Sequence, residues 1–97
     1  MTISDTNLPS MSHLNYEASQ RLRLLREALG LSRPKFADKL GLPPTTLKNY
    51  ELRYREIGGG LFLTIANHPE FMEHTFWLLT GEGMSQLILT TLANKKK

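Results

Sequence analysis

Apolar residues recur every three or four positions through most of this chain, which is the spacing of one buried helix face. The pattern predicts a first helix over residues 15–29, with Gly30 as the residue that ends it. Its recurring apolar positions are Ala18, Leu22, Leu25 and Leu29. Residues 1–14 are rich in Ser, Thr and Asn and lack this periodicity, so a flexible N-terminal arm is expected there.

Two shorter segments follow, and each begins and ends at a recognisable residue. A second helix of about eight residues is predicted after Ser32, a capping residue, and it should end at Gly41. A third is predicted from Pro44, whose fixed φ suits the first helical position, to about Leu52. The inward-facing residues of these two helices are expected to be Phe36, Ala37, Leu40, Leu47 and Tyr50.

The second half of the chain has three more apolar segments. Helices are predicted over residues 61–67, 70–80 and 84–94, with a His-Pro pair between the first two and Gly81 after the second. No segment shows the alternation that is typical of a strand. The chain is therefore predicted to be all-α, with short helices and short turns.

Charge is divided unevenly along the chain, whose formal net charge is +3. Residues 33–55 hold six lysines and arginines against two acids, a net charge of +4. Residues 56–94 hold four glutamates and no lysine or arginine, a net charge of −4, before the three lysines at 95–97. Such a layout can turn one side of a domain toward a polyanion, although an ordinary solvated surface accounts for it as well.

The sequence offers little support for several other classes of protein. The chain has no cysteine, so it forms neither disulfides nor thiolate metal sites, which fits a reducing cytoplasm. No apolar run approaches the roughly 20 residues of a membrane helix, and no signal peptide is evident. Glu70 and His74 share a helix face, but two ligands make a weak metal site. Without a Ser-His-Asp or Cys-His set, we expect neither catalysis nor a cofactor.

Two stretches of the chain resemble one known family. "LREALGLSRPKFADKLGLPPTTLKNYE", residues 25–51, is similar to the Cro/lambda-repressor-like (XRE-type) helix-turn-helix family. Ala37 matches the small residue where the two helices touch, Gly41 matches the turn, and Glu51 matches the acid that closes the second helix of the pair. "FWLLTGEG", residues 76–83, resembles the segment that often closes the family's five-helix domain.

This resemblance has a direct implication for the organisation of the chain. It implies a lambda-repressor-like five-helix domain with the helix-turn-helix pair, which we place at residues 15–83. A short C-terminal helix and a basic tail follow over residues 84–97.

The resemblance also implies that the third helix enters the major groove of double-stranded DNA. Such a helix must offer donors and acceptors to base edges while its other face packs on the core. Asn can bridge two groups of adenine, Lys can donate to guanine, and Thr can meet a thymine methyl group or a phosphate. The residues expected to contact bases are Pro44, Thr45, Thr46, Lys48 and Asn49. A solvated polar face is the plain alternative.

Other residues beside these helices are expected to contact phosphates, which adds affinity and salt dependence but no sequence preference. They are Arg33 and Lys35 at the start of the second helix, and Arg53, Tyr54 and Arg55 after the third. In the alternative, Arg53 or Arg55 pairs with Glu51 or Glu56. The glycines at 58–60 permit either a phosphate held by backbone N–H groups or a flexible loop.

The C-terminal helix adds apolar residues after the five-helix domain is complete. Such a surplus is often buried against a partner, so a homodimer is expected through residues 70–94. The expected contact residues are Trp77, Leu87, Ile88 and Leu92. Packing of these residues onto their own domain is the alternative, and Trp77 matches a core position of the family. A twofold dimer predicts a palindromic operator.

Together with the resemblance, these features predict a transcriptional regulator that binds double-stranded DNA. The simplest form is a repressor that acts in the cytoplasm, on the nucleoid. We expect no association with a membrane and no small-molecule substrate. Two alternatives use the same fold: an adaptor that docks other proteins, and an antitoxin that binds both DNA and a partner protein.

Overall fold

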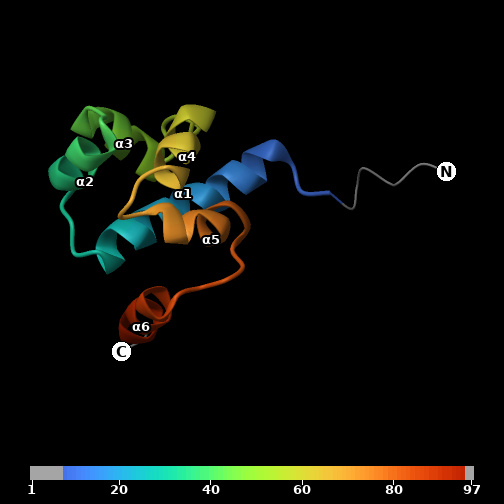
Figure 1. The fold of residues 1–97 in the computed structure, drawn as a ribbon. Coiled ribbons are helices and arrows are strands. Elements are labelled where there is room, and N and C mark those ends of the chain that lie inside the picture. The colour runs from blue at the N-terminus through green and yellow to red at the C-terminus, as the bar shows by residue number, and fades with distance from the viewer. Residues whose placement is uncertain (1–7, 96–97) are drawn as a thin grey trace.

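The computed structural model describes residues 8–95, which form helices and turns without a strand (Figure 1). The elements are α1 (Met11–Ala28), α2 (Arg33–Leu40), α3 (Pro44–Glu51), α4 (Gly59–Ala66), the 3-10 turn η2 (Met72–His74), α5 (Thr75–Thr80) and α6 (Gln86–Lys95). In Figure 1, α2 and α3 lie at one end of the molecule, and α6 stands at its edge. Across the described range, no helix has the length and apolarity needed to cross a membrane. The prediction of an all-α fold is confirmed.

The first helix begins earlier than predicted. α1 starts at Met11, because the Ser10 side chain accepts a hydrogen bond from the backbone N–H of His13 (3.0 Å) and so caps the helix. The predicted start at residue 15 is therefore wrong, and residues 11–14 are helical rather than part of an arm. Residues 1–7 of the predicted arm lie outside the described residues, and residues 8–10 precede the helix.

Both helices of the glycine-separated pair form where the sequence predicts them. At the start of α2, Ser32 accepts a hydrogen bond from the backbone N–H of Lys35 (3.3 Å), and Gly41 ends the helix with a left-handed φ of 72°. α3 begins at Pro44 without a side-chain cap and ends at Glu51. The two helices pack against each other, and α3 also packs against α1.

The boundaries in the second half differ from the predicted ones. α4 begins at Gly59, and the predicted helix 70–80 is divided into η2 and α5. The Phe71 N–H donates to the His68 carbonyl oxygen (3.1 Å) in a turn before η2. Phe71 is buried edge-on against Phe36 (5.2 Å between ring centres) and stacks on His68 (4.2 Å). The helical stretch therefore begins only after this packed turn, at Met72.

A single hydrophobic core lies between α1 and the helices around it. All the inward positions predicted for α2 and α3 are buried: Phe36, Ala37, Leu40, Leu47 and Tyr50. They share this core with buried residues of α1, α4 and α5, among them Leu22, Leu25, Ile65 and Leu78. Burying each large apolar side chain is worth roughly 1.5–3 kcal/mol, and this packing rather than local propensity stabilises such short helices.

α6 is attached to the domain along one side of α1. Ile88 is fully buried, and Leu92 is half-buried against the core. The Lys95 ammonium lies 2.9 Å from a carboxylate oxygen of Glu27, and this hydrogen bond holds the pKa of Glu27 below its ordinary value. The C-terminal helix is therefore held by a narrow apolar contact and an ion pair.

Candidate nucleic-acid interface

α3 has one anchored face and one open face. Leu47, Tyr50 and Glu51 are buried against the body of the domain. The residues predicted to contact bases all stay accessible: Pro44, Thr45 and Lys48 are exposed, and Thr46 and Asn49 are half-buried. One helix of two turns thus carries both an anchor and a polar surface.

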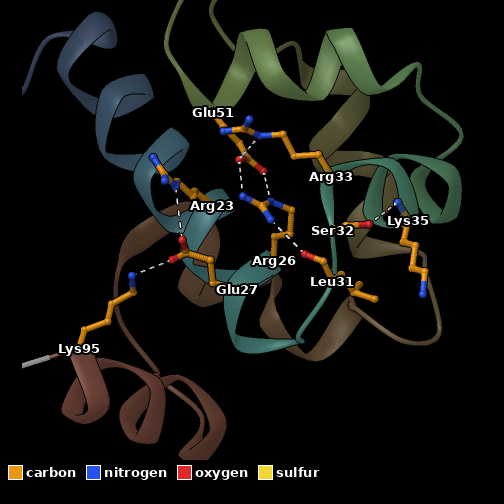
Figure 2. Close-up of polar contacts among 9 residues, drawn as sticks. All are labelled: Arg23, Arg26, Glu27, Leu31, Ser32, Arg33, Lys35, Glu51 and Lys95. Carbon is orange, nitrogen blue, oxygen red and sulfur yellow. Dashed lines mark hydrogen bonds and ion pairs between the residues drawn. The ribbon is translucent and has the colours of Figure 1, made fainter.

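A buried carboxylate fixes the end of α3 (Figure 2). The Glu51 side chain is fully buried and accepts hydrogen bonds from Nε and Nη2 of Arg26, at 2.7 and 3.0 Å. It also accepts one from Nε of Arg33, at 3.0 Å. Arg26 donates in addition to the Leu31 carbonyl oxygen (3.0 Å). The last residue of α3 is therefore tied to α1, to the turn after α1 and to the first residue of α2.

The energetics of burial make this network important for the position of α3. A carboxylate removed from water needs charged or strongly polar partners, and two-point contacts with arginine are among the stronger ones. Removing one member of a buried ion pair typically destabilises a protein by about 3–5 kcal/mol, because a buried charge is left uncompensated. From the sequence, Glu51 was expected to be the acid at the end of α3, with Arg53 or Arg55 as an alternative partner. The sequence did not indicate that Arg26, which is 25 positions away, would be its partner.

The two residues predicted to contact phosphates at the start of α2 have different surroundings. Arg33 is partly buried, with 28% of its side chain exposed, and its Nε is bound by Glu51. Lys35 is exposed, and its side chain points away from Glu51 in Figure 2. Arg33 therefore has an anchoring role that the sequence analysis did not foresee.

The chain leaves α3 through a strained turn. Arg53 has a left-handed φ of 63°, and the Tyr54 N–H donates to the Asn49 carbonyl oxygen (2.9 Å) to close the helix end. A residue with a side chain in this conformation costs about 1–2 kcal/mol. The Arg53 guanidinium lies over the Tyr16 ring, 4.1 Å from its centre. A cation held over an aromatic ring contributes about 0.5–1 kcal/mol at an exposed site.

The predicted phosphate contacts after α3 are all on the surface: Arg53, Tyr54 and Arg55. The Arg55 guanidinium lies 5.6 Å from the centre of the Tyr50 ring. Among residues 8–95, neither arginine is within ion-pairing distance of a carboxylate, and Glu51 is bound by Arg26 and Arg33 instead. The alternative pairing of Arg53 or Arg55 with Glu51 or Glu56 is therefore wrong.

The glycine run lies at the start of α4. Gly58 is the residue before the helix, and Gly59 and Gly60 are in its first turn. A Cβ atom added at Gly59 or Gly60 would have no neighbour within 4 Å. Crowding within the chain therefore does not explain the run, and the space around these glycines is open.

The four residues predicted to form a dimer contact fall into two groups. Trp77 and Ile88 are buried in the chain's own core, the role given above as the alternative, so neither offers a surface to a second copy. Leu87 is exposed and Leu92 half-buried. Two other apolar residues of α5 are exposed, Phe76 (64%) and Leu79 (47%), and they were not among the predicted contacts, although they are three positions apart on one helix.

Comparisons with known proteins agree with this geometry. Residues 22–70 match a family model described as helix-turn-helix, a range that includes Arg26, Glu51 and all of α2 and α3. Repressor protein C of Escherichia phage P2 is 31% identical over 64 residues, which are 66% of this chain. The chain spans 65% of the length of that relative. No solved structure matches significantly. The chain therefore belongs to the helix-turn-helix family, of the Cro/lambda-repressor type.

Proposed function

We propose that this protein is a transcriptional repressor that binds one palindromic sequence of double-stranded DNA as a homodimer, in the cytoplasm. The observation that supports this most is the division of α3 into an anchored face and an accessible polar face. A helix that enters the major groove needs both, because its outer side chains must be held at a fixed angle to the base edges.

The accessible side chains of α3 suit the reading of bases. The Asn49 amide can both donate to and accept from adenine, and the Lys48 ammonium can donate to guanine. Thr45 and Thr46 offer a methyl group for thymine and a hydroxyl for either a base or a phosphate. Pro44 has no N–H, so it contributes contact through its ring alone. These contacts determine sequence preference.

Affinity for any duplex comes from the residues on either side of α3. Lys35 precedes it and Arg53, Tyr54 and Arg55 follow it, and all four are exposed. Each phosphate that a cation neutralises makes the slope of log K against log salt steeper by about 0.9 for double-stranded DNA. Arg33 contributes chiefly through the anchor, since Glu51 holds its Nε.

Repression is supported by the relative in phage P2, which is named as a repressor. Occupying a promoter requires only DNA binding, so it is the simplest activity for this arrangement. The homodimer would form through residues 70–94, where Phe76, Leu79 and Leu87 are exposed. A twofold pair of domains would place two copies of α3 about 34 Å apart, one turn of DNA.

The test is the selection of bound sequences from random duplex DNA, at two salt concentrations. The expected result is one symmetric motif that is still enriched at the higher salt. Weak binding to every duplex that disappears at higher salt would overturn sequence-specific recognition. A single motif without symmetry would overturn the twofold dimer on a palindrome and leave specific binding in place.

A further inference from the structure

Tyr16 and Arg53 form a contact between α1 and the turn after α3 that no step above requires. Glycine is the least strained residue at a left-handed position, yet this one holds an arginine with a φ of 63°. The arginine is placed over the ring of Tyr16, 4.1 Å from its centre. We infer that Tyr16 is a positioning residue, which holds the Arg53 guanidinium where it binds a phosphate of the DNA backbone. This inference rests on the proposed function.

The contact with the Tyr16 ring leaves the hydrogen-bond donors of Arg53 available. Those N–H groups lie around the edge of a planar guanidinium, and its central carbon lies over the Tyr16 ring without a hydrogen bond to it. Three arginines of the domain are paired with carboxylates: Arg23, Arg26 and Arg33. Within residues 8–95, the Arg53 side chain has no carboxylate in ion-pairing distance and no hydrogen-bond acceptor. Apart from its contact with the Tyr16 ring, its charge is therefore not engaged within the described residues.

The position of Tyr16 is itself fixed by α1. Its hydroxyl accepts a hydrogen bond from the Gln20 side chain (3.1 Å), one helical turn further along. A free arginine side chain has many conformations, and ordering them on binding lowers affinity. An aromatic ring that already holds the guanidinium removes part of that loss. Tyr16 would thus raise affinity without touching the DNA.

Open space borders the contact on two sides. Tyr16 and Arg53 line a cleft of about 500 Å³ together with α6, and also a smaller hollow of about 190 Å³. The smaller hollow brings Arg53 and Arg55 together, with Glu56 as the one acid in its lining. Two arginines that line one hollow suit a phosphate group, which takes several donors at once.

The experiment is a double-mutant cycle on the full chain, with the duplex obtained by the selection described above. Affinity is measured by fluorescence anisotropy over a series of salt concentrations for the wild type, Tyr16→Ala, Arg53→Gly and the double variant. Arg53→Gly should make the slope of log K against log salt shallower by about 0.9, the loss of one phosphate contact. Tyr16→Ala should weaken binding about two- to fivefold, and only where Arg53 is present.

Two further variants separate positioning from folding. Tyr16→Phe keeps the ring and loses only the hydrogen bond from Gln20, so it should retain most of the affinity that Tyr16→Ala loses. Arg23→Gln removes a cation that is paired with Glu27, and it should leave the salt slope unchanged. Thermal melting monitored by circular dichroism should show Arg53→Gly no less stable than the wild type, because glycine relieves the left-handed strain. Arg53→Asn removes the same cation, and asparagine also tolerates this conformation, so its salt slope provides a second measurement of the lost phosphate contact.

The outcomes distinguish the inference from the proposed function. The inference is overturned if Tyr16→Ala weakens binding equally in proteins with and without Arg53. It is also overturned if Tyr16→Ala does not weaken binding in either protein. Specific DNA binding stands in both cases. If the wild type prefers no duplex at all, both are overturned. Coupling confined to the background that contains Arg53, together with the shallower slope, supports the inference.

Discussion

Asn49 is half-buried on the open face of α3, and Lys35 is exposed at the start of α2. If Asn49 reads a base, Asn49→Ala should relax the preference at one base position in each half-site, by about 1–3 kcal/mol. The reason is that alanine cannot replace the paired donor and acceptor of the amide. Competition binding with duplexes changed at one position at a time measures the effect.

Lys35→Ala is the matched control for that measurement. It should weaken all duplexes alike and make the salt slope shallower, because a phosphate contact carries no sequence information. Arg33→Ala cannot serve this purpose, since Arg33 also binds Glu51. An Asn49→Ala protein that loses affinity uniformly, with every base preference intact, would show that Asn49 does not read a base.

The short helices of the pair depend on contacts beyond themselves. α3 has 8 residues, and isolated helices shorter than about 12–15 residues are marginal in water. Glu51→Gln should therefore destabilise the protein by about 3–5 kcal/mol, because it leaves Arg26 and Arg33 without their carboxylate. Urea unfolding followed by circular dichroism gives the free energy of unfolding.

The exposed ion pair between Lys39 and Glu70 (2.9 Å) offers a comparison within the same protein. Glu70→Gln removes one carboxylate in the same way, but from a solvated pair, and it should cost about 0–1 kcal/mol. Similar losses from Glu51→Gln and Glu70→Gln would mean that the buried network does not anchor α3.

Elements whose ends are set locally could mostly be predicted from the sequence, although the Ser10 cap that starts α1 was not recognised. α2 and α3 were placed correctly because Ser32, Gly41 and Pro44 act on the backbone next to them. The late start of the predicted helix 70–80, at Met72, follows a turn in which Phe71 packs against Phe36, a contact between distant parts of the chain. The accessible residues of α3 followed from helical spacing, whereas the partners of Glu51 required the folded structure.

For the molecule as a whole, the proposed dimer gives the next prediction. Phe76 is 64% exposed on α5, so Phe76→Glu should cost little in a monomer. In a dimer through residues 70–94 it would bury a charge and should dissociate the two copies. Sedimentation equilibrium should show a dimeric wild type and a monomeric variant. Circular dichroism should show that the two have the same helix content.

Leu63→Glu is the control for that experiment, since Leu63 is 67% exposed on α4 and lies outside residues 70–94. This variant should remain a dimer. A wild type that sediments as a monomer at concentrations where it binds DNA would rule out the homodimer. Dissociation by Leu63→Glu instead of Phe76→Glu would move the contact to α4.

Because α3 has one buried face and one accessible face, the two faces can change independently as such a protein evolves. The side chains at positions 45, 46, 48 and 49 are accessible. The carboxylate that holds the helix in place, that of Glu51, is buried on its opposite face. Exchanging the outer residues leaves the enclosed group and its two arginines untouched. If these outer residues read bases, substitutions on the surface of α3 would change the DNA sequence that such a protein binds without changing the buried network that holds the helix.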